Sequence, residues 1–149
     1  GLRDEALISD IGAEALATSF FSAPTSPADN PYQAKLHELY TAAYGEPADK
    51  PFVDQTYDAT FMALLAVEQA GSADRSKMAE ALRAIASAPG EKVGPGEWAK
   101  AKALIAEGKD IDYDGAGGSY DFDENGDVAG FIGKFVVDGT VYKQVAIVE

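Results

Sequence analysis

Three helical patterns follow one another between residues 54 and 107, and no strand-like run separates them. Apolar residues recur there with the spacing of one helix face, and Gly71, Gly90 and Gly108 stand where these helices are expected to end. Because an α/β domain buries strands between its helices, such a series needs a sheet that other residues supply. The first helix has an alanine-rich face suited to close packing on such a sheet, made of Ala59, Ala63, Ala66 and Ala70.

The last third of the chain has the pattern of strands instead. Residues 120–122 alternate as a strand does, and Asn125-Gly126 after them is a strong signal for a tight turn. A glycine-rich loop is expected just before this strand. Two β-rich runs separated by the hairpin dipeptide Asp138-Gly139 close the chain, at residues 131–137 and 141–148.

The first third mixes both patterns. We expect a short helix at residues 4–11, a strand at residues 18–21 and a proline-rich loop at residues 22–31. Asn30 then suits the N-cap of a further helix that begins with a proline, and Gly45 suits the position after its end.

Composition excludes several classes of function. The formal net charge is −13, and such a surface repels phosphate backbones, so no nucleic-acid partner is expected. There is no cysteine, which excludes disulfides, thiolate metal sites and cysteine nucleophiles. No apolar run approaches the roughly 20 residues of a membrane span.

Four motifs in order resemble the C-terminal part of one family. Tyr57-Asp58-Ala59 opens a helix that ends Ala70-Gly71-Ser72, and the helix around residues 78–85 follows it. The glycine-containing stretch at residues 109–115 and the turn at residues 121–127 complete the series. Together they resemble the type I periplasmic solute-binding proteins of branched-chain amino acid (leucine-isoleucine-valine-binding) ABC transporters.

The resemblance implies an α/β fold made of two lobes joined by hinge crossings, helix-rich here with a C-terminal β-hairpin region. Residues 1–50 would belong to the second lobe, residues 51–131 to the first lobe, and residues 132–149 would return to the second. It also implies that the N-terminal part of the same protein is a partner and supplies most of the pocket.

The implied function is capture of a small solute between the lobes and its delivery to an ABC permease, outside the cytoplasm and without chemistry. The solute stays open among aliphatic amino acids, amides, aromatic acids and short-chain acids. A ligand-sensing domain of a receptor or regulator with the same fold is the first alternative. A small helical enzyme or interaction module, complete at 149 residues, is the second.

Three residues near the expected first crossing are candidates for the solute site. Phe52 resembles an aromatic residue that forms a wall around the solute, although it can also be plain core. Tyr57 can present its hydroxyl group to the cleft or pack under the start of its helix. Asp54 can meet a solute ammonium group, but capping its helix is the better expectation. The family's own ammonium-binding carboxylate would fall just before Gly1.

No catalytic residue, metal ligand or cofactor is predicted. Asp121, Asp123 and Asn125 begin like a calcium loop, but Ile132 stands where that loop needs a bidentate Glu, so a solvated turn is expected. His37 is the only histidine and is expected on a helix surface. Without a cysteine or a nucleophile-elbow motif, hydrolase chemistry has little support, although carboxylates for acid–base catalysis are plentiful.

Overall fold

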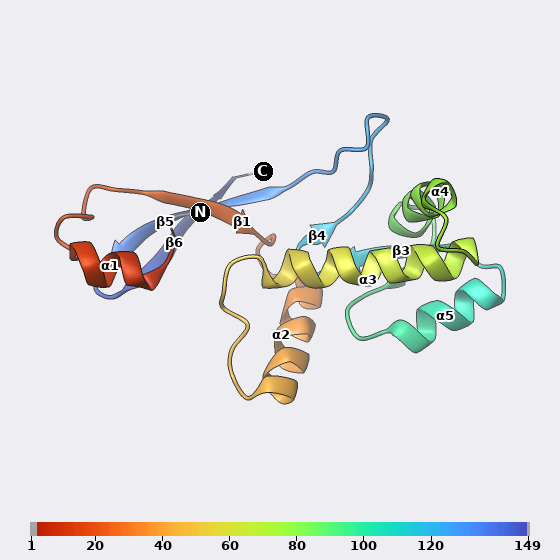
Figure 1. The fold of residues 1–149 in the computed structure, drawn as a ribbon, viewed down its shortest axis with the longest axis horizontal. Coiled ribbons are helices and arrows are strands. Elements are labelled where there is room, and N and C mark those ends of the chain that lie inside the picture. Colours follow the sequence, from red (N-terminus) through yellow and green to blue (C-terminus); the bar gives the residue numbers. More distant parts are fainter. Residues whose placement is uncertain (1–2, 149) are drawn as a thin grey trace.

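The computed structural model describes residues 3–148, and its elements form two groups joined by extended segments (Figure 1). The first group is an antiparallel sheet in the order β1-β5-β6, with α1 in contact with β6. Its elements are α1 (Glu5–Ile11), β1 (Phe21–Thr25), β5 (Phe131–Asp138) and β6 (Val141–Val148). The sheet therefore joins a strand from the beginning of the chain to two strands from its end.

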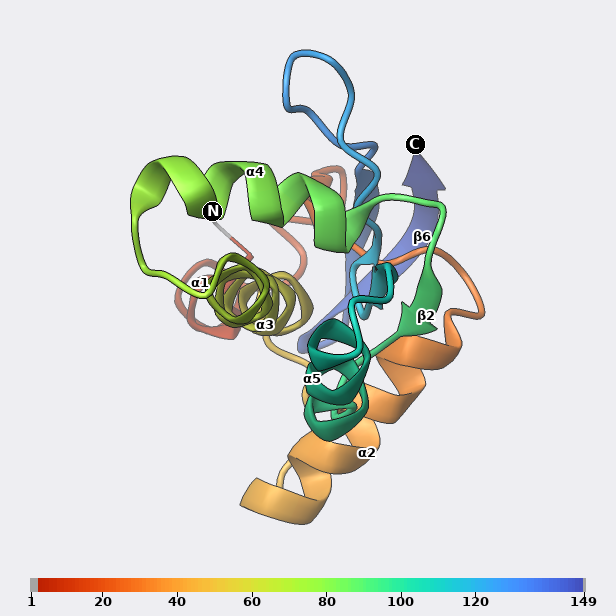
Figure 2. The ribbon, with the colours of Figure 1, turned by 90° about the vertical axis from the view of Figure 1, so that its right-hand side faces the viewer.

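The second group is helical around a small sheet. Helix α3 runs through its middle, and α4 and α5 lie on different sides of it (Figure 2). In the sheet, β2 pairs in parallel with β3, and β3 pairs antiparallel with β4. The elements are α2 (Pro31–Tyr44), α3 (Val53–Ala70), α4 (Arg75–Ala86), β2 (Glu91–Val93), α5 (Trp98–Ala106), β3 (Ile111–Gly115) and β4 (Gly118–Ser119). Within residues 3–148, no helix has the length and apolarity needed to cross a membrane.

The main core lies between α3, α4, α5 and β3. Leu65, Ile85 and Tyr113 are almost completely buried there. Phe61 joins the elements, because its ring lies 5.3 Å from that of Tyr113 and 5.8 Å from that of Trp98. Offset and edge-to-face aromatic contacts of this kind add to the free energy gained from burial alone.

The helix boundaries follow their capping residues. The Asn30 side chain accepts the N–H group of Tyr32 at 2.9 Å, and Pro31 opens α2, as predicted. Gly45 and Gly71 take the left-handed conformation after α2 and α3, with φ angles of 73° and 58°. These endings confirm the predictions, since glycine reaches positive φ without a steric cost.

Helix α3 begins differently from the prediction. Phe52 occupies the N-cap position, with a φ of 69° and no side-chain cap. The expectation that Asp54 caps this helix is wrong, because its carboxylate lies inside the first turn and bonds other elements.

Two strands also differ from their predicted places. The strand expected at residues 18–21 lies at Phe21–Thr25 instead, so it overlaps the expected strand only at Phe21 and continues into the predicted loop. Its Pro24 is tolerated because β1 is an edge strand, where a missing N–H group breaks no ladder. No strand forms at residues 120–122, whereas Ile111–Gly115, part of the expected glycine-rich region, is the central strand β3.

Strand β3 alternates apolar and polar residues, as a strand does, but it was missed because its aspartates and the glycines that follow were interpreted as a loop. It is buried on nearly every position, including Asp112, whose carboxylate lies 2.8 Å from Lys92 Nζ on β2. The β5–β6 hairpin around Asp138-Gly139, by contrast, confirms its prediction.

The chain passes between the two groups at residues 26–30 and again at residues 120–130. Helix α2 contacts β3, and Asn30 Nδ2 donates to the carbonyl oxygens of Gly115 and Ala116, so α2 lies with the helical group. The division of the chain into lobe segments at residues 50 and 131 stays a prediction about the whole protein.

Candidate functional site

Phe52 stands between two hollows on the surface of the molecule. Its side chain is 48% exposed although it is large and apolar. Its φ of 69° is an uncommon conformation for an aromatic residue and carries a backbone strain of about 1–3 kcal/mol. The fold holds this side chain outward at a strained position, which is a common feature of ligand sites.

The first hollow, which we call the crossing cavity, lies between the β1-β5-β6 sheet and the connector before α3. Its volume is about 810 Å³, within the usual range for small-molecule sites. Charged side chains line it together with Phe52, and they carry both signs. The lining residues are Arg3, Asp4, Glu5, Ser22, Ala23, Pro24, Asp49, Lys50, Pro51, Phe52, Val141 and Tyr142.

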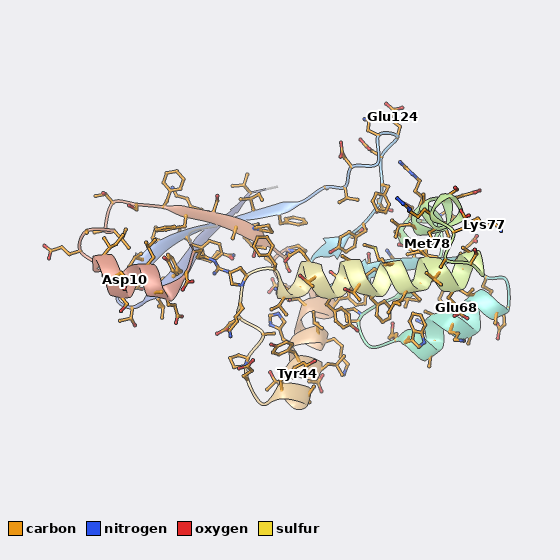
Figure 3. The ribbon with its side chains drawn as sticks, viewed as in Figure 1. Asp10, Tyr44, Glu68, Lys77, Met78 and Glu124 are labelled. Atoms are coloured by element: carbon orange, nitrogen blue, oxygen red, sulfur yellow. The ribbon has the colours of Figure 1, made fainter. Side chains whose placement is uncertain are left out.

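The second hollow is an apolar groove between α2 and α3, with a volume of about 580 Å³. Leu36, Tyr44 and Phe52 lie along it, and Figure 3 shows Tyr44 at the far end of α2. Tyr57 also lines this groove. Its ring stacks on Phe61 at 5.6 Å, and its hydroxyl oxygen accepts the N–H group of Gly96 at 2.9 Å. Burial is the main cause that raises the pKa of the Tyr57 hydroxyl.

Asp54 lies beside these hollows but lines neither of them. It is 9% exposed, and Ser26 Oγ and Gln33 Nε2 donate to its Oδ2 at 3.0 and 2.8 Å. His37 Nε2 lies 2.9 Å from its Oδ1. The His37 side chain is 37% exposed, as expected on a helix surface, and it also turns toward α3, so that Asp54 joins the segment after β1 to α2 and α3.

Asp58, one turn further along α3, is completely buried. Its carboxylate receives two donors on each oxygen. Tyr113 Oη and the N–H group of Ala116 donate to Oδ1 at 2.7 and 3.0 Å, and the N–H group of Gly117 and Tyr120 Oη donate to Oδ2, each at 2.7 Å. Burial raises the pKa of this carboxyl group, while the four hydrogen bonds, led by that from Gly117, oppose the rise. The loop at Ala116 and Gly117, between β3 and β4, is thus bonded to α3 through the Asp58 side chain.

Groups within the acidic turn at residues 121–127 form hydrogen bonds with one another. Asp123 Oδ1 accepts the N–H groups of Asn125 and Asp127, each at 2.8 Å. Glu124 stands at its tip in Figure 3. Among the described residues, no group of three or more His, Cys, Asp or Glu side chains has an arrangement that would hold a metal ion.

Comparison with known proteins assigns the chain to a family. The model of the family described as "Receptor family ligand binding region" matches residues 16–131. The chain belongs to this family.

Two relatives agree with this assignment. The chain is 29% identical over 131 residues to BasB of Halobacterium salinarum, a chemotactic signal transduction system substrate-binding protein, covering 81% of this chain and 32% of BasB. It superposes on the crystal structure of the leucine-binding protein LivK of Thermotoga maritima with a TM-score of 0.65 and 28% identity, covering 99% of this chain and 35% of that one. The predicted resemblance and the α/β fold class are confirmed, and the chain spans about a third of the length of these relatives.

The part that the receptor ligand-binding family model matches contains Phe52, Asp54 and Tyr57, but not Arg3. Sequence reasoning assigned no role to Arg3 or Asp58. The Tyr57-Asp58-Ala59 motif was the available signal for Asp58. No motif described above contains Arg3.

The tyrosines around Asp58 give a testable pH dependence. Burial, followed by the charge of Asp58, raises the pKa of both Tyr113 and Tyr120 above the ordinary value of about 10. Above that pH the unfolded chain loses these protons while the folded chain keeps them, so the free energy of unfolding falls as the pH rises. We expect two of the seven tyrosines to ionise only as the protein unfolds, as followed by tyrosinate absorbance after a pH jump. Full titration of all seven in the folded state would contradict this.

Proposed function

We propose that this chain is part of a solute-binding protein that holds a small organic molecule between two lobes and delivers it to an ABC import permease. The observation that supports it most is Phe52, an exposed aromatic side chain on a strained backbone, facing a cavity between the two groups of elements. The leucine-binding protein in the structural comparison makes an amino acid or a related organic acid or amide the first solute class to test.

In this proposal the two groups of elements belong to two lobes, and the segments at residues 26–30 and 120–130 are hinge crossings. The first crossing then differs from the division at residue 50 expected from the sequence, because α2 lies with the helical group. The N-terminal part of the same protein completes both lobes and supplies further pocket residues. Closure over the solute stabilises one arrangement of the lobes, and the permease binds that arrangement. The protein works in the periplasm or outside the cell, and it catalyses no reaction.

A second candidate is a sensor. BasB is described as belonging to a chemotactic signal transduction system, so a related protein can present its solute to a receptor instead of a permease. The two candidates share the solute site and differ in what recognises the closed form. Co-purification of the solute-loaded protein with a permease or with a transducer separates them.

The solute site is tested with the whole protein, through the melting temperature in a panel of amino acids, amides and small organic acids. We expect at least one compound to raise the melting temperature, and Phe52→Ala to weaken its binding by about 10- to 100-fold, the loss of a buried aromatic contact of roughly 1.5–3 kcal/mol. Phe20→Ala is the matched control, because Phe20 is 67% exposed and lines neither hollow. Equal effects of both substitutions would remove Phe52 from the site, and no stabilising compound at all would contradict solute binding.

A further inference from the structure

The second connection between the two groups, which we call the return crossing, is held on α4 for most of its length. It comprises residues 120–130. Arg83 Nη1 on α4 donates to the carbonyl oxygen of Asp123 at 2.7 Å, and the Arg83 guanidinium carbon lies 5.8 Å from the centre of the Phe122 ring. A charge-assisted hydrogen bond and a cation–π contact thus join one side chain of α4 to this crossing.

The acidic turn within the return crossing has hydrogen bonds at its beginning and across its ends. The N–H group of Ala88, two residues after α4, donates to Asp121 Oδ1 at 3.2 Å. The N–H group of Asp123 donates to the carbonyl oxygen of Asp127 at 2.8 Å, which closes the turn. The crossing is therefore part of the helical group as far as Asp127.

Residues 128–130, between the acidic turn and β5, have no such support. All three are exposed, and within residues 3–148 no hydrogen bond outside the helices and strands involves them. A Cβ atom at Gly130 would meet no atom within 4 Å apart from its chain neighbours. The next residue, Phe131, is already paired with Thr25 in the sheet. Only three residues thus separate the part of the chain held on α4 from the part held in the sheet.

The first connection, which we call the outgoing crossing, is bonded to the helical group at both of its ends. Ser26, directly after β1, donates from Oγ to Asp54 Oδ2 on α3 at 3.0 Å. Asn30, directly before α2, donates to two carbonyl oxygens of the loop after β3. The residues between them therefore stay with the helical group, and this crossing meets the sheet at the junction of Thr25 and Ser26.

A hinge consists of a few residues that absorb the change in backbone angles, and hydrogen bonds to neighbouring elements limit that change. We propose that the return crossing bends only at residues 128–130, and that Arg83 is the positioning residue that keeps residues 121–127 on the helical group. Without Arg83 the bending segment extends into the acidic turn, and the two groups take up a wider range of arrangements. The inference deepens the proposed function, on which it rests for the movement of two lobes.

Hydrogen exchange of the whole protein without solute tests where the crossing bends. Peptides that separate the two segments are analysed by mass spectrometry, and each exchange rate is compared with that of an unstructured chain. We expect residues 128–130 to exchange at about the unstructured rate. The bonded N–H groups of Asp123 and Asp127 should exchange at least about fivefold more slowly than that rate, the factor for one hydrogen bond of ordinary strength. Equal protection of the two segments would overturn the inference.

Spin labels test the role of Arg83, again in the whole protein without solute. Residues 1–149 contain no cysteine, so labels are attached through Asp10→Cys on α1, Lys77→Cys on α4 and Glu124→Cys at the tip of the turn, all exposed positions (Figure 3). Electron paramagnetic resonance then gives the distribution of each distance. We expect a narrow distribution for the pair at positions 77 and 124, within the helical group, and a broad one for the pair at positions 10 and 77, across the two groups.

In Arg83→Gln the distribution for positions 77 and 124 should broaden. Arg75→Gln is the matched control, because Arg75 is an exposed arginine of the same helix with no hydrogen bond or ion pair in the described part of the chain, and it should leave that distribution narrow. The inference is overturned if the wild-type distribution within the helical group is as broad as the one across the groups, if it stays narrow in Arg83→Gln, or if Arg75→Gln broadens it equally. These outcomes do not depend on whether any compound of the panel binds, so a failure of this inference is distinct from a failure of the proposed function.

Discussion

Asp58→Ala is expected to lower the free energy of unfolding by about 3–5 kcal/mol, because each buried donor left without an acceptor costs about 1–3 kcal/mol. The substitution leaves four donors around an empty space, two of them tyrosine hydroxyl groups and two of them backbone N–H groups of the glycine loop. Buried donors without an acceptor are expensive, and two of these are in a backbone that cannot turn away. Urea unfolding of the purified protein measures the change.

Two comparisons make this result specific. Asp58→Asn keeps the shape but offers one acceptor oxygen, so we expect it to cost less than the alanine variant and still well over 1 kcal/mol. Asp10→Ala removes a carboxylate from the exposed end of α1, where Figure 3 shows it pointing to solvent, and should change stability by less than about 0.5 kcal/mol. An Asp58→Ala protein as stable as Asp10→Ala would show that the four hydrogen bonds contribute nothing.

Asp54→Ala is expected to destabilise the protein by about 2–4 kcal/mol. It removes the acceptor of Ser26 and Gln33 and the partner of His37, and thereby separates the segment after β1 from α2 and α3. Asp110→Ala, at an exposed carboxylate, is the control and should be nearly neutral.

The same variant separates a positioning role of Asp54 from a contact with the solute. If Asp54 holds the crossing segment, stability falls while the affinity for the bound compound, measured at a temperature where the variant is folded, changes little. If Asp54 meets a solute ammonium group, an amine-bearing compound loses affinity and its amine-free analogue does not. A stable Asp54→Ala protein with a selective loss of amine binding would overturn the positioning role.

Local signals in the sequence located much of the fold. The caps of α2, the glycines after α2 and α3 and the last hairpin were predictable because each depends on residues next to one another. Strand β1 was misplaced since the proline that marks a loop also fits an edge strand. Strand β3 was missed although its residues alternate, because two aspartates and the glycines after it are also typical of a loop, and only the fold shows that the aspartates are paired or buried.

The site was less predictable, because its contacts join residues far apart in the chain. Asp58 meets donors 55 to 62 positions away, and no local pattern marks such a pairing. The contact of His37 with Asp54 was not predicted, because this partner lies 17 residues later, on another helix. Phe52 was named through family resemblance alone, and its strained backbone and exposure became visible only in three dimensions.

The pairing of β1 with β5 constrains how the two halves of the molecule can move. Thr25 and Phe131 are register partners, so both connections leave the sheet at the same point, one outgoing and one returning. Two connections that leave a sheet at adjacent residues can bend together about a shared axis, but each restricts the other from twisting. In the proposed function, this geometry favours opening and closing about one axis, next to the crossing cavity that Phe52 lines.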